Sequence, residues 1–121
     1  MSAALARFSG RVAVVTGAAQ GVGYACAHRI GQEGGRVVIA DFAEGPAHEA
    51  VEMLRSAGIE AHAACADLAQ PEAADEVMAF AKREFGRLDV VVNNVGGTIW
   101  KKPFWHYRPE EIRQEVERSF W

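Results

Sequence analysis

The stretch VAVVTGAAQGVG, residues 12–23, decides the fold of this 121-residue chain. Its first four residues are apolar and mostly β-branched, which predicts a buried strand. Gly17, Gly21 and Gly23 follow, and this spacing predicts a tight turn that opens a helix. A glycine has no Cβ, so the backbone can turn sharply and a pyrophosphate can come close to it. The helix start offers unpaired N–H groups and a positive dipole end to that anion. The stretch therefore indicates a dinucleotide site, without identifying a reaction.

Strands and helices alternate along the rest of the chain. We expect strands at residues 11–16, 36–41, 59–64 and 88–92, and helices at residues 21–33, 45–56, 71–85 and from 109 onward. This alternation predicts an α/β fold, a Rossmann-type doubly wound parallel sheet, in a single domain over residues 1–121. The expected strand order is 3-2-1-4. We expect the fourth strand to be apolar and covered on both faces.

The C-terminal part of the sequence predicts an incomplete sheet. The helix that begins at Pro109 has no glycine or asparagine cap before Trp121. In the expected strand order, nothing in the chain could pair with the outer edge of the fourth strand. We therefore expect the N-terminal half of a larger domain, truncated after the fourth strand and the following helix, and prone to aggregate in isolation.

Composition excludes several classes of protein. Half of the residues are hydrophobic and 24% are charged, which is typical of a soluble globular domain. The formal net charge of −3 argues against a nucleic-acid-binding protein. No apolar run reaches the ~20 residues of a membrane span, and the N-terminus does not resemble a signal peptide, so a cytoplasmic location is the default expectation. The isolated Cys26 and Cys65 and the four histidines have no metal-ligand spacing, and no metal site is expected.

An acidic residue follows the second expected strand. Asp41 lies 18 residues after Gly23, where a carboxylate can accept both hydroxyls of an adenosine ribose. The same charge would repel a 2′-phosphate, and the neighbouring Phe42 and Gln20 are not basic. These residues favour NAD over NADP. The alternative interpretation is an acidic residue that caps the next turn.

A second acidic residue follows the third expected strand. The carboxylate of Asp67, in the pair Asp67-Leu68, could accept the amino group of an adenine. It could equally cap the helix that begins at Pro71. The two interpretations are compatible.

Three motifs together resemble the short-chain dehydrogenases/reductases. They are the glycine motif of residues 16–23, Asp67-Leu68, and Asn93-Asn94-Val95-Gly96, which has valine where this family usually has alanine. The resemblance implies that Asn93 stabilises the central sheet and that Asn94, Val95 and Gly96 border the ribose and nicotinamide of the cofactor. It also implies a homodimer or homotetramer at full length, with the helix from Pro109 near a subunit interface. The predicted cofactor-binding residues are Gly17, Gln20, Gly21, Val22, Gly23, Asp41, Phe42, Asp67, Leu68, Asn94, Val95 and Gly96.

A narrower resemblance covers residues 93–100, 102–104 and 115–121. These stretches are similar to the benzoate cis-diol dehydrogenases (1,6-dihydroxycyclohexa-2,4-diene-1-carboxylate dehydrogenases). The resemblance implies oxidation of a cis-dihydrodiol carboxylic acid by NAD, giving a β-keto acid that loses CO2 and becomes a catechol. Ser119 falls where most of the wider family has an asparagine of the catalytic helix. A short-chain dehydrogenase with another alcohol specificity, or a non-catalytic NAD-binding module, are the alternatives.

The catalytic residues of the family are absent from these 121 residues. The resemblance implies a serine and a Tyr-x-x-x-Lys pair, whereas the only tyrosines are Tyr24 and Tyr107, and Glu111 lies four residues after Tyr107. We name no catalytic residue and expect this chain alone to be inactive. Lys102 is a candidate partner of the substrate carboxylate, although a solvated loop lysine is the simpler interpretation.

Three aromatic residues lie near Lys102. Trp100, Phe104 and Trp105 could wall a pocket for a ring-shaped substrate. Alternatively, they could cover the sheet or form a subunit contact. The sequence leaves both interpretations open.

Overall fold

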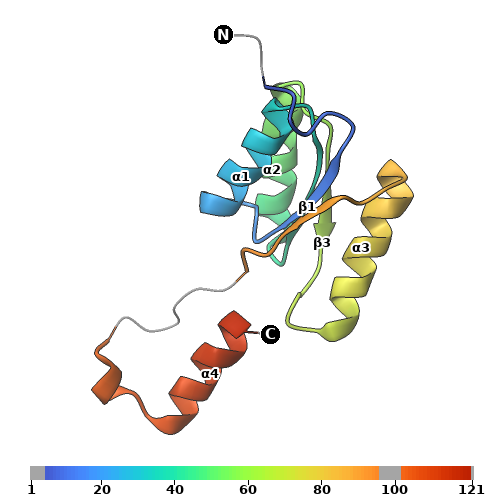
Figure 1. Cartoon of the computed structure of the whole chain (residues 1–121). Coiled ribbons are helices and arrows are strands. Elements are labelled where there is room, and N and C mark those ends of the chain that lie inside the picture. The colour runs from blue at the N-terminus through green and yellow to red at the C-terminus, as the bar shows by residue number, and fades with distance from the viewer. Residues whose placement is uncertain (1–4, 96–101, 121) are drawn as a thin grey trace.

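The computed structural model describes residues 5–95 and 102–120, with the backbone alone for residues 118–120 (Figure 1). The elements follow in the order β1 (Val12–Thr16), α1 (Gly21–Gln32), β2 (Arg36–Asp41), α2 (Glu44–Ser56), β3 (Ala61–Cys65), α3 (Pro71–Phe85), β4 (Val90–Val92), the 3-10 helix η1 (Phe104–His106) and α4 (Pro109–Phe120). Strands and helices alternate through the first three units, as the sequence predicts.

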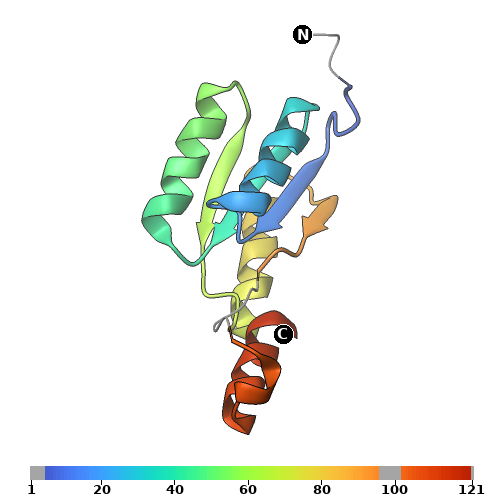
Figure 2. The same cartoon turned by 90° about the vertical axis from the view of Figure 1, so that its left-hand side faces the viewer.

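The four strands form one parallel sheet in the order β3-β2-β1-β4. Helices α1 and α2 cover one face of this sheet and α3 covers the other (Figures 1 and 2). Successive residues of a strand point to opposite faces, so β1 supplies both layers of the core. Val15 packs in the cluster under α1 and α2, and Val14 packs in the cluster under α3. The predicted Rossmann-type fold and strand order are confirmed.

Strand β4 differs from the expectation for residues 88–92. It begins at Val90, and its central residue, Val91, is 42% exposed. Among the described residues, β4 pairs only with β1, so it forms one edge of the sheet. The residue before it, Asp89, accepts a hydrogen bond from the Val12 backbone N–H instead of continuing an apolar run. The expectation of a strand covered on both faces was therefore wrong.

The remaining boundaries differ little from the expected ones. β3 begins at Ala61 and not at Ile59, because Ile59 is a buried loop residue packed against Gly31 of α1. Helix α3 ends at Gly86, which takes the left-handed conformation with φ of 80°. Such a conformation is costly for residues other than glycine, so the predicted end of this helix has a clear steric cause.

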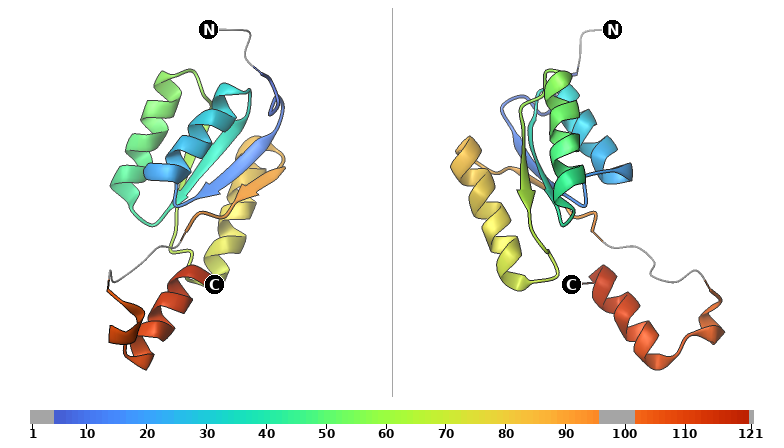
Figure 3. Two further views of the ribbon diagram at one scale, coloured as in Figure 1. Left: turned by 60° about the vertical axis from the view of Figure 1, so that its left-hand side comes forward. Right: turned by 180° about the vertical axis from the view of Figure 1, so that it is seen from behind.

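Helix α4 lies beyond the edge of the sheet at which the strands end, apart from the three-layer core (Figure 3). Neither of the buried core clusters includes a described residue of η1 or α4. In the described part of the chain, no helix has the length and apolar character needed to cross a membrane.

Candidate functional site

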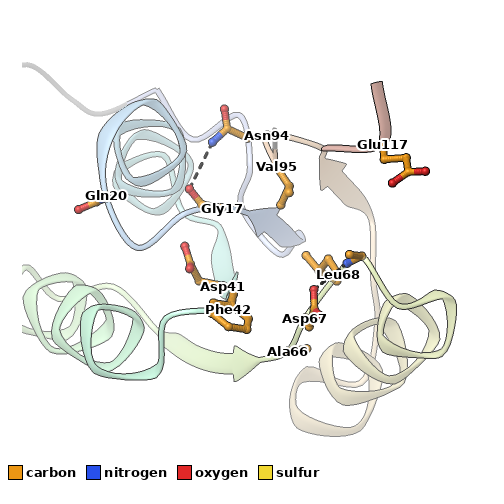
Figure 4. Close-up of a pocket in the computed structure, with 11 residues that line it drawn as sticks. Gly17, Gln20, Asp41, Phe42, Ala66, Asp67, Leu68, Asn94, Val95 and Glu117 are labelled. Atoms are coloured by element: carbon orange, nitrogen blue, oxygen red, sulfur yellow. Dashed lines mark hydrogen bonds between the residues drawn. The ribbon is translucent and has the colours of Figure 1, made fainter. Parts of the chain in front are cut away.

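A cavity of about 680 Å³ opens at the carboxyl edge of the sheet (Figure 4). Parallel strands all end at this edge, so the loops that follow β1, β2, β3 and β4 meet here. The lining residues are Gly17, Gln20, Asp41, Phe42, Ala66, Asp67, Leu68, Ala69, Asn94, Val95 and Glu117. Most of the predicted cofactor-binding residues thus line one cavity. Gly21, Val22 and Gly23 lie next to it at the start of α1, and Gly96 lies outside the described residues.

The glycine turn has the backbone geometry that its sequence predicts. Gly17 and Gly21 have φ angles of 60° and 65°, in the left-handed region that disfavours side chains. Gly23 is limited by space instead: a Cβ there would lie 2.6 Å from both Asn94 Nδ2 and the Gly17 carbonyl oxygen. The first turn of α1 can therefore pack directly on the loop after β4. This close packing requires glycine at position 23.

The N-terminus of α1 is suited to an anion. Gln20 precedes the helix without making a side-chain capping hydrogen bond, and the first turn holds no acidic residue. By contrast, Glu44 and Glu72 occupy the first turns of α2 and α3. Unpaired N–H groups and the helix dipole attract negative charge at such a position. The start of α1 can thus receive a phosphate group next to the cavity.

Asp41 uses its carboxylate to hold two loops. Its Oδ2 accepts a hydrogen bond from the Ala19 backbone N–H, and its Oδ1 accepts one from the Ala43 N–H, each at 3.0 Å. The second bond confirms the interpretation of an acidic residue that caps the next turn. The first bond, to the glycine turn, was not predicted. Each carboxylate oxygen keeps a further lone pair, so contact with a ribose remains possible and stays a prediction.

Asp67 closes a turn before α3 but does not cap the helix. Its Oδ1 accepts from the Ala69 N–H at 3.0 Å, and its carbonyl oxygen accepts from the Gln70 N–H. Gln70, and not Asp67, occupies the N-cap position of α3, so the predicted capping role of Asp67 was wrong. The Asp67 carboxylate borders the cavity, with Phe42, which is 75% exposed, also on its rim (Figure 4). A role toward adenine stays a prediction.

Sequence reasoning missed Ala66, Ala69 and Glu117 in the cavity lining, and it missed the role of Thr16 beside the cavity. Its Oγ1 accepts hydrogen bonds from the backbone N–H groups of Asn94 (2.8 Å) and Val95 (3.3 Å). The same hydroxyl donates to the Val92 carbonyl oxygen at 3.3 Å. The sequence signal was a hydroxyl residue at the end of an otherwise apolar buried strand. Buried polar groups are nearly always paired, so this residue needed a partner.

A second polar cluster lies at the start of α4. The ammonium group of Lys102 lies 2.7 and 2.8 Å from the carboxylate oxygens of the buried Glu111. These hydrogen bonds, together with those from Arg108, lower the pKa of Glu111 to about 2. The positive charge of Lys102 is therefore already matched by a carboxylate. The hypothesis that it meets a substrate carboxylate stays a prediction.

Tyr107 lies against the same cluster. The Lys102 ammonium is 5.1 Å from the centre of its ring, and the phenol donates a hydrogen bond to Glu115. Burial and the nearby Glu115 raise the pKa of Tyr107. A tyrosine that acts as a general base must be deprotonated near neutral pH, and a raised pKa disfavours the deprotonated form. Tyr107 is therefore unsuited to that role.

The aromatic residues of η1 do not cover the sheet. Phe104 and Trp105 are 72% and 79% exposed, so this interpretation was wrong for both. Trp100 and the side chain of Ser119 lie outside the described residues. Within the described part of the chain, no three His, Cys, Asp or Glu side chains are placed to share a metal ion.

Comparisons with known proteins agree with this geometry. A family model described as short chain dehydrogenase matches residues 11–121. The chain is 50% identical over 113 residues to a 1,6-dihydroxycyclohexa-2,4-diene-1-carboxylate dehydrogenase of Pseudomonas putida, and 45% identical over 113 residues to the Acinetobacter baylyi protein of the same name. Each alignment covers 93% of this chain but only 41% and 43% of the respective relative. The chain thus spans less than half the length of these relatives.

Solved structures show the same similarity. A 7α-hydroxysteroid dehydrogenase complexed with NADH and 7-oxo glycochenodeoxycholic acid superimposes with a TM-score of 0.86 and 28% identity, covering 96% of this chain and 45% of that one. L-sorbose reductase from Gluconobacter frateurii, complexed with NADPH and L-sorbose, gives a TM-score of 0.80 and 30% identity, covering 92% and 42%. The two complexes contain different nicotinamide cofactors, so the likeness in fold does not distinguish between them.

Proposed function

This chain belongs to the short-chain dehydrogenase family, and from that premise we propose that it is the NAD-binding part of a dehydrogenase for a cis-dihydrodiol carboxylic acid. In the proposed reaction, the ring carbon that bears the secondary hydroxyl gives a hydride to NAD, and the hydroxyl loses its proton. The resulting β-keto acid loses CO2 and becomes a catechol. The 50% identity to the Pseudomonas putida relative is the observation that carries the proposed substrate.

The residues present fit a dinucleotide. The glycine turn places the left-handed Gly17 and Gly21, which have no side chains, beside the cavity, and the start of α1 lacks an acidic residue that would repel a phosphate. Asp41 supports NAD over NADP, because the cavity lining that includes Asp41, Asp67 and Glu117 contains no described lysine or arginine. A 2′-phosphate would meet like charge there without a compensating cation.

A titration of the 121-residue chain tests the cofactor. Binding of NADH and NADPH is measured by calorimetry and by quenching of tryptophan fluorescence. We expect NADH to bind at least tenfold more tightly than NADPH, and Asp41→Ala to reduce that ratio. Equal affinities for the two cofactors in the unsubstituted chain would contradict the assignment to NAD.

A fusion protein tests the substrate. Residues 1–121 are joined to the remaining sequence of the Pseudomonas putida relative, which supplies the part of the enzyme that this chain does not span. We expect NADH formation with the carboxylated cis-diol and less with a diol that lacks the carboxylate. Equal turnover of both diols would instead favour a dehydrogenase of another alcohol specificity.

The chain by itself is proposed to bind the cofactor without turning over a diol. Its 121 residues contain no Tyr-x-x-x-Lys pair, and the pKa of Tyr107 is raised. Measurable turnover by the 121-residue chain would contradict this. At family length we propose a homodimer or homotetramer on the family resemblance alone, and a cytoplasmic location as the default expectation.

A further inference from the structure

We propose that Asp41 is a positioning residue that holds the glycine turn in its binding shape before any ligand is present. This inference rests on the proposed dinucleotide site and adds a second task to Asp41 beyond contact with a ribose. The turn must present its N–H groups to phosphates, and Asp41 fixes the backbone from which those groups project. A single side chain would then act on both the ribose and the phosphates of the ligand.

The contacts of Asp41 join two loops of the cavity. Its Oδ2 holds the N–H of Ala19, in the middle of the glycine turn, while its Oδ1 holds the N–H of Ala43, in the loop after β2. The backbone adds a further link, because the Gly17 N–H donates to the carbonyl oxygen of Ala40 at 2.8 Å. The glycine turn is thus bonded to the end of β2 at two points, at Gly17 through the Ala40 carbonyl and at Ala19 through the Asp41 side chain.

The turn needs such support because its own backbone is permissive. Ala19 lies between Gly17 and Gly21, which have φ angles of 60° and 65°. A glycine can adopt several other backbone conformations as well, so neither residue fixes this shape by itself. Each glycine loses much conformational freedom when it is fixed in one of them. A carboxylate makes stronger hydrogen bonds to N–H groups than a neutral acceptor does. The hydrogen bonds of Asp41 therefore order the glycine turn already in the folded chain, and ligand binding does not have to order it.

This arrangement leaves acceptor capacity for a ligand. An ionised carboxylate offers about four lone-pair sites, and the two backbone N–H groups occupy two of them. Positioning the loop and accepting ribose hydroxyls are hence compatible. The two tasks predict different responses to a ligand that has phosphates but no ribose hydroxyls.

Two ligands separate the tasks. We compare ADP with 2′,3′-dideoxy-ADP, which keeps the adenine and both phosphates but cannot donate a ribose hydroxyl to Asp41. If Asp41 positions the turn, Asp41→Ala weakens binding of dideoxy-ADP by at least fivefold and weakens ADP binding further. If Asp41 only contacts ribose, dideoxy-ADP binds the variant and the unsubstituted chain equally, and the proposal is overturned. Asp75→Ala, which removes one exposed carboxylate from α3, is the control for net charge.

Amide hydrogen exchange gives a readout that needs no ligand. We expect Asp41→Ala to accelerate exchange at Ala19 and Ala43 by at least tenfold, while the amide of Val14 in the core of β1 stays slow. Asp41→Asn keeps one acceptor oxygen, so it restores protection at one of these two amides and not at both. It also replaces Asp41→Ala if that variant does not fold. Unchanged exchange at Ala19 in Asp41→Ala, or unchanged exchange at both Ala19 and Ala43 in Asp41→Asn, overturns the proposal.

The two arms separate this inference from the proposed function. A chain that binds neither ADP nor NADH contradicts the proposed dinucleotide site, and the exchange rates then still decide whether Asp41 holds the turn. A chain that binds ADP, with dideoxy-ADP affinity and Ala19 exchange both insensitive to Asp41, contradicts the inference alone.

Discussion

The hydroxyl oxygen of Thr16 lies 2.8 Å from the backbone nitrogen of Asn94, and this hydrogen bond joins the last residue of β1 to the loop after β4. A neighbouring hydrogen bond reinforces it, in which Asn94 Nδ2 donates to the Gly17 carbonyl oxygen at 3.3 Å. The glycine turn and the loop after β4 are therefore held together by polar side chains on both sides. Since both loops line the same cavity, its shape depends on this link.

Removal of the Thr16 hydroxyl is the direct test of that link. Thr16→Val keeps the shape of the side chain but leaves the Asn94 N–H and the Val92 carbonyl without this partner. A buried polar group left unpaired costs about 1–3 kcal/mol, so the free energy of unfolding should fall by that amount in urea denaturation. Thr16→Ser keeps the hydroxyl and serves as the matched control. A loss in Thr16→Ser without a loss in Thr16→Val would show that the methyl group, and not the hydrogen bonds, stabilises the site.

Substitution of Gly23 tests the close packing of α1 on the loops. In Gly23→Ala, the new Cβ would lie 2.6 Å from the Gly17 carbonyl oxygen and 2.9 Å from the Ala18 Cα, so backbone must move. Overpacking of this kind typically costs about 1–3 kcal/mol, and the affinity for NADH should fall with it. Gly45→Ala in α2 is the control, because a Cβ there meets no atom within 4 Å. Alanine should be tolerated or slightly stabilising at that helical position, and a loss of NADH affinity there would contradict the steric argument.

These two sites show what the sequence could and could not predict. The glycine spacing predicts the turn because the φ angles of Gly17 and Gly21 are local properties of this stretch. The end of α3 at Gly86 follows from a local signal in the same way, whereas the strand order was expected from the usual topology of a doubly wound sheet. The partners of Thr16 lie more than seventy residues away, and no local pattern indicates which backbone groups its hydroxyl meets. Likewise, the exposure of β4 depends on its place at the sheet edge and not on its apolar sequence.

The buried Glu33 should make stability depend on acid pH. Hydrogen bonds from Arg7 and Arg29 lower the pKa of Glu33 to about 2, from an ordinary value of 4.5. A carboxyl group whose pKa is lower in the folded state stabilises the fold above its unfolded pKa, and this contribution is lost as the pH falls. The loss attributable to Glu33 should thus occur between about pH 4.5 and pH 2. It is measured as the slope of the unfolding free energy against pH.

Two variants isolate the share of Glu33 in that slope. Glu33→Gln should flatten it and lower stability near neutral pH, because the amide cannot replace the charge that faces both arginines. Glu52→Gln is the control, since Glu52 pairs with Arg55 on the surface with its side chain 72% exposed. An equal slope of unfolding free energy against pH in the unsubstituted chain, Glu33→Gln and Glu52→Gln would contradict the role of Glu33.

Lys102 and Glu111 predict opposite effects on substrate binding in the fusion with the Pseudomonas putida relative. We expect Lys102→Ala to raise KM for the carboxylated diol, because it removes the candidate cation. Glu111→Gln should lower KM, because the carboxylate that now holds the ammonium at 2.7 Å is neutralised. A KM that rises equally in both variants, with equal loss of thermal stability, would show that the pair only fastens the loop to α4.

The exposed edge of the sheet should govern how the 121-residue chain behaves in solution. An apolar edge strand presents unpaired backbone groups that can pair with another chain, and Val91 is 42% exposed at the centre of β4. We expect the chain to aggregate at concentrations where light scattering detects it, and Val91→Lys to reduce that scattering, because a charge on an edge strand opposes pairing. Met53→Lys is the matched control: Met53 is 59% exposed, but it lies on helix α2. Both substitutions bring the net charge of −3 closer to zero, which by itself favours association. A benefit confined to Val91→Lys would therefore come from the edge, whereas equal scattering in both variants would contradict the role of β4.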